Sequence, residues 1–306
     1  MLYSSGTTGA PKAITHSHGG VLLELNKYHA FHNDVKKDEL FFWYTTTGWM
    51  MWNFLHGAWL RGASILIYDG SPAYPEVDQM WKMASELKVN HFGTSAPYIL
   101  ANRKAGMNPK VNYDLSKLRS IGSTGSPLPP EGFDYVYEKI KEDVWLTSMS
   151  GGTDVCTAFV GGCIVRPVYE GEIQCRALGC ALYCLDENGN KLENEEGEMV
   201  ITESMPCMPI YFWNDEAKVR YSDGLIINIE KKDGDHYMPL FVMLKEGIIL
   251  DEELKKRIKS QLRSDYSPRH VPDEIIQVAD IPYTLSGKKM ETPIKKILMG
   301  RPVEKC

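Results

Sequence analysis

The chain has 306 residues, enough for one large domain and a smaller one. Its 43% apolar and 24% charged residues are typical of an ordinary globular protein, and a net charge of -6 gives no reason to expect nucleic acid or an anionic membrane as a partner. No apolar run reaches the length of a membrane span. Seven cysteines without a C-x-x-C pair indicate reduced thiols in a cytoplasmic protein and argue against zinc.

The chain opens with a loop rich in glycine and hydroxyl side chains, YSSGTTGAPK at residues 3–12. Its glycines can adopt positive φ angles and let the backbone approach a ligand. Successive N–H groups in such a turn form a concavity that binds anions. The spacing differs from the G-x-x-x-x-G-K-[ST] loop of P-loop NTPases. Taken alone, the segment fits a polyphosphate site and equally well an ordinary turn between strands.

Up to about residue 147, runs of strand character alternate with runs of helix character. The pattern predicts helices over 21–32, 52–60, 76–88, 96–105 and 135–142, and strands over 39–45, 62–68, 91–94, 118–121 and 144–147. This alternation predicts an α/β unit with a largely parallel sheet. Ligands bind beyond the carboxyl ends of such strands, where the glycine and hydroxyl loops at 122–128 and 148–154 fall.

The character of the chain changes after Cys156. Short alternating strands are expected at 171–174, 181–186 and 197–202, which predicts a β-rich subdomain over about 156–221. From residue 222 the order strand, turn, strand, helix (251–263, capped by Asp251), strand predicts a small α+β domain. We therefore expect a main domain over 1–221 and a smaller domain over 222–306.

Four separated stretches resemble the adenylate-forming superfamily, which includes acyl-CoA synthetases, luciferases and the adenylation domains of peptide synthetases. The stretches are the loop at 3–12, GSP at 125–127, GTD at 152–154 and PYTLSGK at 282–288. The superfamily's usual glutamate is an aspartate at Asp154. The resemblance implies an α/β adenylation domain, incomplete at its N-terminus, followed by a smaller mobile lid domain. It also implies an AMP-forming acid–thiol ligase that uses ATP, Mg²⁺ and coenzyme A.

The site residues that the resemblance implies fall into four groups. Nucleotide binding is expected at Ser5, Gly6, Thr7, Thr8, Gly9, Lys12, Gly125, Ser126, Pro127, Ser150, Gly151, Gly152, Thr153 and Asp154. The expected catalytic residues are Lys288 and Thr153, Asp154 is the expected magnesium ligand, and Arg269 is expected to contact coenzyme A. The histidines at 18, 91 and 270 are expected to be caps or core polar groups.

The acyl substrate is expected to be larger than acetate. The segment at 48–49 and the tail at 267–275 and 293–298 most resemble the branch of the superfamily that activates acetoacetate. Gly151 stands where acetate-activating members carry a tryptophan that closes the acyl pocket, so the missing indole leaves room for a longer acid. The expected pocket residues are Trp49, Met50, Met51, Thr124 and Gly151. Propionate and butyrate remain alternatives to acetoacetate.

The chain departs from the superfamily pattern in two places. The superfamily has a segment before the phosphate loop, which we expect to be missing here, and only seven residues stand where a ribose-binding aspartate and the hinge between domains are expected. We expect that a segment is missing near residues 221 and 222, and we do not assign Asp223 to the missing role. A non-catalytic remnant that binds nucleotide is therefore a second hypothesis.

Overall fold

The computed structural model describes residues 1–4, 12–186, 188–213, 229–230, 236–244, 249–265, 271–278, 294 and 297–298. The chain divides into two units, one made of Met1–Ser4 and Ala13–Trp213 and the other of Ser5–Lys12 and Asn214–Cys306. The expected domain boundary at residues 221 and 222 lies outside the described residues and stays a proposal.

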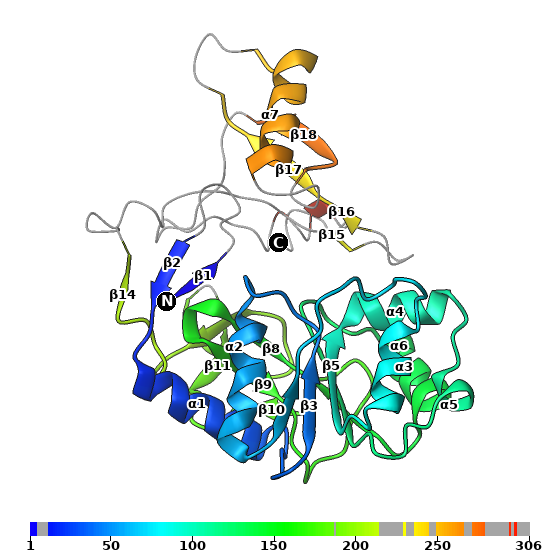
Figure 1. The fold of residues 1–306 in the computed structure, drawn as a ribbon. Helices are drawn as coiled ribbons and strands as arrows, with labels where there is room; N and C mark the ends of the chain where they lie inside the picture. Colours follow the sequence, from blue (N-terminus) through cyan, green and yellow to red (C-terminus); the bar gives the residue numbers. More distant parts are fainter. Residues whose placement is uncertain are drawn as a thin grey trace. The chain divides into compact units, whose positions relative to one another are not determined.

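A five-stranded sheet runs through the first unit (Figure 1). Its strands lie in the order β4-β3-β5-β6-β7, and every neighbouring pair is parallel. They are β3 (Leu40–Trp43), β4 (Ser64–Leu66), β5 (His91–Ser95), β6 (Ser120–Thr124) and β7 (Trp145–Ser148). The parallel sheet predicted from the alternating pattern is confirmed.

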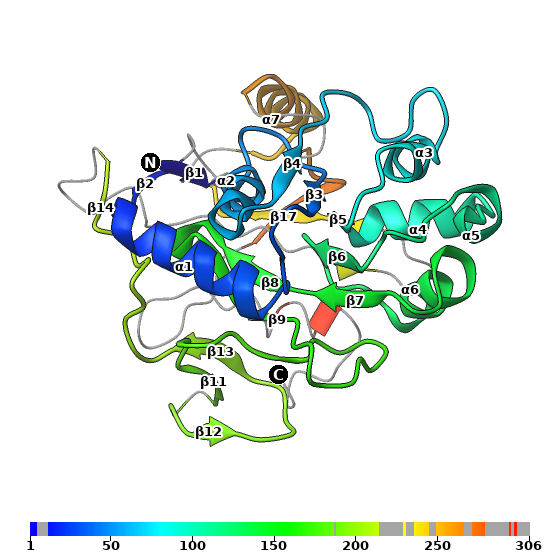
Figure 2. The same ribbon diagram turned by 60° about the horizontal axis from the view of Figure 1, so that its bottom comes forward.

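Helices cover both faces of this sheet (Figures 1 and 2). One face carries α3 (Gln79–Glu86), α4 (Ala96–Lys104) and α6 (Pro130–Tyr135), which continues as a π-helical turn at Val136–Ile140; α5 (Pro109–Asn112) follows α4. The other face carries α1 (His18–Phe31), α2 (Met50–Gly57) and a 3-10 turn at Ala58–Arg61. Because side chains alternate along a strand, Phe42 and Phe92 enter the first core and Phe41 and Trp43 enter the second.

Trp43 explains why two central strands carry glycine. Its indole is only 4% exposed and lies across β5 and β6. A Cβ atom at Gly93 would stand 2.0 Å from Cδ2 of Trp43, and one at Gly122 would stand 2.5 Å from its Cη2. Both positions therefore need glycine to admit the ring.

Three small sheets surround this core. An antiparallel sheet joins β8 (Ser150–Gly152), β9 (Thr157–Gly161) and β10 (Cys175–Arg176). A second, visible apart from the helices in Figure 2, joins β11 (Leu182–Leu185), β12 (Lys191–Leu192) and β13 (Glu198–Ile201). The third joins β1 (Leu2–Ser4), β2 (Lys12–Thr15) and β14 (Tyr211–Phe212).

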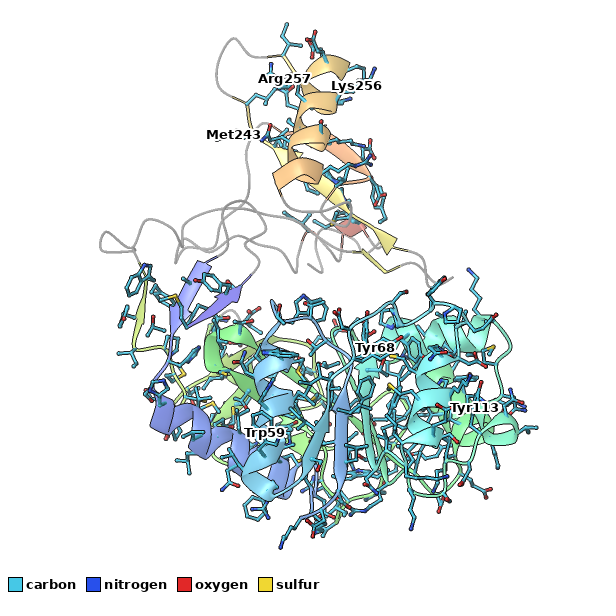
Figure 3. All side chains as sticks on the ribbon, viewed as in Figure 1. Trp59, Tyr68, Tyr113, Met243, Lys256 and Arg257 are labelled. Carbon is cyan, nitrogen blue, oxygen red and sulfur yellow. The ribbon has the colours of Figure 1, made fainter. Side chains whose placement is uncertain are left out.

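The second unit combines short strands with one long helix. The strands β15 (Ile229–Glu230) and β16 (His236–Tyr237) are antiparallel, whereas β17 (Pro239–Val242) and β18 (Glu274–Gln277) are parallel. Figure 3 shows Met243 just beyond β17 and Lys256 and Arg257 on α7 (Glu252–Asp265). Asp251 caps this helix as predicted, since its Oδ1 accepts from the backbone N–H of Leu254 at 2.7 Å. Among the helices described, none is both long enough and apolar enough to cross a membrane.

Several predicted elements need correction. The run at 62–68, expected to be buried, forms the edge strand β4, and Ile67 just beyond it is 53% exposed. Leu87 does not join the buried face of α3, because the helix ends at Glu86 and Leu87 is its C-cap. Residues 171–174, all of them described, form no strand; β10 begins at Cys175.

Three helices begin earlier than their apolar patterns indicate. One of them, α2, begins at Met50 instead of residue 52. Ser17 caps α1 at His18, with its Oγ accepting from the N–H of Gly20 at 3.0 Å. The helix expected at 135–142 begins at Pro130, since proline suits the first turn of a helix.

Candidate functional site

The carboxyl ends of β3, β5, β6 and β7 lie at one edge of the parallel sheet, so the loops that follow them are neighbours. The hydroxyl of Thr124, the last residue of β6, donates to the carbonyl oxygen of Met149 beyond β7 at 2.9 Å. The N–H of Met149 in turn donates to the carbonyl of Ser123 at 2.9 Å. These two bonds hold the 125–127 loop and the 150–154 segment at the same edge.

The 125–127 loop presents backbone and small side chains to solvent. Gly125 has a φ of 93°, the left-handed region that favours glycine, and no heavy atom lies within 4 Å of where its Cβ would be. Ser126 is half-buried and Pro127 is exposed, while Leu128 is buried and anchors the loop. The loop can therefore receive a flat group from outside without moving.

The strand β8 leads into the turn that carries Thr153 and Asp154. The turn spans Thr153–Val155 as one 3-10 turn, and β9 returns antiparallel to β8. Thr153 is half-buried and Asp154 is exposed, so both side chains are accessible at the sheet edge. The arrangement places a hydroxyl donor and a carboxylate on adjacent residues.

Gly151 is required by the close approach of two strands. A Cβ atom at this position would stand 2.2 Å from the carbonyl oxygen of Thr157 and 2.6 Å from Cα of Ala158. Real Cβ atoms essentially never lie within 3.0 Å of another heavy atom. A side chain at this position would therefore point at the backbone of β9. This contact gives Gly151 a packing role that the sequence did not indicate.

The five residues expected to form an acyl pocket are placed differently from one another. Met51 is 8% exposed and belongs to the core beneath α2, whereas Met50 is half-buried. Trp49 precedes α2 and is 54% exposed. The hydroxyl of Thr124 is engaged by Met149, as described above. The pocket as a set stays a prediction.

A row of three hydroxyls crosses the sheet near the same edge. Thr94 on β5 is in register with Ser123 on β6, which is in register with Ser148 on β7. The Oγ atoms of all three are buried, and none has a hydrogen-bond partner within the described part of the chain. Sequence reasoning missed this row, because Ser123 and Ser148 lie beyond the ends of the predicted strands 118–121 and 144–147 and the register between strands is not visible in the sequence.

A buried carboxylate of α1 contacts β9 and forms an ion pair. Glu24 of α1 is 2% exposed, pairs with Lys27 and accepts from the hydroxyl of Thr157 at 2.9 Å. Burial is the main cause that raises the pKa of the Cys156 thiol to about 12, and the charge of Glu24 adds to it. The same two causes raise the pKa of the Cys207 thiol to about 12. These thiols stay protonated at neutral pH and are not nucleophiles there.

The other cysteines and His91 agree with their predicted roles, whereas His18 is neither a cap nor a core group, since Ser17 caps α1. All six cysteines described are free thiols, as expected. His91 is buried, with its ring nitrogens 2.7 Å from the hydroxyl of Ser120 and 2.7 Å from the carboxylate of Glu39. His18 is the exposed first residue of α1.

Several expected site residues lie outside the described residues. These are Ser5, Gly6, Thr7, Thr8, Gly9, Arg269, His270 and Lys288. Lys12 is described only as the first backbone position of β2.

Asp154 can serve as a ligand to a magnesium ion held mainly by phosphate oxygens. Among the described residues no group of three or more His, Cys, Asp or Glu side chains could hold a metal. Mg²⁺ commonly binds through one or two carboxylates together with substrate phosphates and water. One exposed carboxylate therefore fits a magnesium–nucleotide complex better than a metal cage made of protein alone.

Several known proteins similar to this chain share one name. The chain is 40% identical over 361 aligned positions to "Acetoacetyl-coenzyme A synthetase" of Rhizobium meliloti (strain 1021), an alignment that takes in 99% of this chain and 56% of that protein. It is 35% identical over 363 positions to "Acetoacetyl-CoA synthetase" of Gallus gallus, with 99% and 54% covered. A solved structure, "Acetoacetyl-CoA Synthetase from Streptomyces lividans", superposes with a TM-score of 0.70 at 41% identity, covering 99% of this chain and 55% of that one.

The alignment lengths also bear on the missing segment. The chain spans about half the length of the curated relatives it matches. The alignment with the Rhizobium meliloti protein runs over 361 positions, 55 more than the 306 residues of this chain, so at least 55 positions of that alignment have no residue here. That such a gap falls near residues 221 and 222 stays a prediction. The family model described as AMP-binding enzyme matches residues 1–212, and the chain belongs to this family.

Proposed function

We propose that this chain carries the site of an AMP-forming acyl-CoA synthetase that activates acetoacetate. In the first half-reaction, a carboxylate oxygen of the acid attacks the α-phosphorus of ATP, and the bond to the bridging oxygen breaks to release pyrophosphate. In the second, the thiolate of coenzyme A attacks the acyl carbon and AMP leaves. The names of these relatives, whose alignments cover 99% of this chain, support acetoacetate as the acid.

The observation that carries this proposal is the pair of loops tied together at the carboxyl edge of the sheet. The hydrogen bond between Thr124 and Met149 fixes the exposed 125–127 loop relative to the turn at Thr153. A nucleotide lying along this edge would place adenine on the first loop and its phosphates at the second. This is the position where open α/β sheets bind ligands.

The roles of the residues follow from the charge that the reaction must manage. An anionic carboxylate has to approach a polyanion, so positioning and neutralisation of charge are the main tasks of the protein. Thr153 donates its hydroxyl to the α-phosphate, and Ser5, Thr7, Thr8 and Lys12 hold the β- and γ-phosphates. Asp154 holds Mg²⁺, which when bound neutralises phosphate charge.

Lys288 is proposed to bring positive charge to the reacting carboxylate and α-phosphate. We expect Lys288→Ala to abolish formation of acyl-AMP while sparing thioester formation from preformed acyl-AMP, because the ammonium acts only where charge develops during adenylation. Acetoacetate-dependent exchange of labelled pyrophosphate into ATP measures the first half-reaction. Lys289→Ala is the matched control and should leave both half-reactions intact. Equal losses of the two half-reactions in Lys288→Ala would refute the role.

The choice of acid is tested with a panel of carboxylic acids in the same exchange assay. Acetoacetate should give the highest kcat/KM, ahead of acetate, propionate and butyrate. A higher value for propionate or butyrate would replace acetoacetate as the proposed substrate while leaving the reaction class unchanged. Cytoplasmic location and a set of small-molecule partners limited to the acid, ATP and coenzyme A belong to the same proposal.

A second candidate function is nucleotide binding without turnover. The observation that favours it is that this chain lacks a residue at 55 or more positions of its alignment with the Rhizobium meliloti relative. Binding of ATP by calorimetry without pyrophosphate exchange for any acid of the panel would support it. Exchange with acetoacetate would exclude it.

A further inference from the structure

His16 joins three segments that are far apart in the sequence. It follows β2 directly and is half-buried. Its Nδ1 lies 2.8 Å from the carbonyl oxygen of Cys207, and its Nε2 lies 3.1 Å from the carbonyl oxygen of Thr153. Thr153 is 137 residues away along the chain. One side chain thus connects the strand after the phosphate loop, the candidate turn and the loop before β14.

Both contacts of the ring are to carbonyl oxygens, which only accept hydrogen bonds. A neutral imidazole has one N–H and can donate to one of them, while the doubly protonated ring can donate to both. A hydrogen bond from a charged ring is also shorter and stronger than one from a neutral ring.

The bond to Thr153 acts on the backbone of the turn and leaves its hydroxyl free to meet a ligand. The same carbonyl of Thr153 also accepts from the N–H of Cys156 at 3.2 Å, which closes the turn. Gly152, on the other side, is extended, with φ −147° and ψ 151°. His16 is therefore a hydrogen-bonding contact from outside the hairpin that fixes where this carbonyl, and with it the Thr153 side chain, stands relative to β2.

We propose that His16 is a positioning residue for adenylation, which holds the Thr153 turn against the strand that follows the phosphate loop. The effect on catalysis rests on the proposed function. The contact of His16 with the Thr153 carbonyl, called the clamp below, rests on the geometry alone. Because the transition state requires closer alignment than the bound ground state, loss of the clamp should lower kcat more than it raises KM.

The test compares His16→Phe, which keeps a planar ring without donors, with His16→Gln, which keeps an N–H donor on a flexible stem. His18→Gln is the matched control, since His18 is exposed and only two residues away. Two readouts are needed: amide hydrogen exchange over residues 150–156, and the kcat and KM for ATP in acetoacetate-dependent pyrophosphate exchange. Exchange of the Cys156 amide reports directly on the turn, because that amide is bonded to the same carbonyl.

We expect His16→Phe to speed exchange of the Cys156 amide by about tenfold and to lower kcat by about 100-fold, with KM for ATP changed by less than about threefold. His16→Gln should recover part of both effects, and His18→Gln should match the wild type. Unchanged amide exchange in His16→Phe would refute the clamp. Faster exchange with unchanged kcat would refute the positioning role and leave a purely structural bond.

Failure of the proposed function gives a different result. In that case the wild-type protein shows no pyrophosphate exchange with any acid, and the variants are judged by amide exchange and by calorimetric binding of ATP. A clamp that positions Thr153 should then still speed exchange of the Cys156 amide in His16→Phe relative to His18→Gln, with the Kd for ATP raised by less than about threefold. Unchanged exchange of this amide would refute the inference independently of turnover.

Discussion

Gly151→Ala tests whether the close approach of β8 and β9 decides the residue at this position. The new Cβ would stand 2.2 Å from the carbonyl oxygen of Thr157 and 2.6 Å from Cα of Ala158, and both of these atoms belong to the backbone. To reach even 3.0 Å from that oxygen, the strands must separate by about 0.8 Å at this point. Such a shift weakens the antiparallel pairing of β8 with β9 that holds the Thr153 turn.

We expect Gly151→Ala to lower the free energy of unfolding by about 2–3 kcal/mol, from overpacking and from weakened backbone hydrogen bonds worth about 1 kcal/mol each. For a unit of about 200 residues this corresponds to a fall in Tm of about 4–12 °C. Urea unfolding followed by tryptophan fluorescence and calorimetric Tm measure the change.

Gly152→Ala is the matched control for this prediction. Its Cβ would meet side-chain atoms alone, the tip of the Phe159 ring at 3.3 Å and Oδ2 of Asp154 at 3.7 Å, and its backbone is extended, so the expected change is within about 0.5 kcal/mol. A Gly151→Ala variant as stable as Gly152→Ala would show that the two strands do not approach as closely as described. The same contact means that any larger side chain at 151 must also displace β9.

Two further predictions concern the sheet and its amino-terminal edge. Gly122→Ala should lower the free energy of unfolding in urea by about 1–3 kcal/mol, because its Cβ would meet the buried Trp43 ring at 2.5 Å. Adding Trp43→Phe should recover part of this loss, and strictly additive effects of the two substitutions would refute the contact. Burial acts to raise the pKa of Glu39, but hydrogen bonds, first that from His91, outweigh it and lower the pKa from 4.5 to about 2. A carboxylate with a lowered pKa stabilises the fold above pH 4.5, and this stabilisation is lost as the pH falls toward 2. Glu39→Gln should therefore make the free energy of unfolding fall less steeply between pH 5 and 3. An unchanged slope would contradict the role of Glu39.

The half-buried polar network around Glu39 lies at the opposite end of the sheet from the candidate site. Arg119 contacts both Glu39 and Asp34, and its Nη2 lies 2.7 Å from Asp34. These residues flank the starts of β3, β5 and β6, so they contribute to the stability of the sheet. Variants here should change unfolding without changing the relative kcat/KM of different acids.

Much of the fold followed from local patterns in the sequence. The alternation of apolar strands and amphipathic helices over the first 150 residues was sufficient to predict the parallel sheet, because each element carries its own period. The loops expected at 122–128 and 148–154 do lie at the ends of β6 and β7, but residues 122–124 still belong to β6 and residues 150–152 form the unpredicted strand β8. Boundaries were less certain, since capping by Ser17 and the proline at 130 act within one turn of a helix and outweigh the apolar pattern there.

The sequence by itself therefore determined the fold class, the family and the loops where a nucleotide is proposed to bind, because these depend on residues close together in the chain. Only the tertiary structure decided how those loops are held. The role of Gly151 depends on a strand spacing, the row of hydroxyls across β5, β6 and β7 depends on their register, and the bridge from His16 to Thr153 joins residues 137 apart. Distances across strands and between loops are set by the packing of the whole unit, and no local pattern records them.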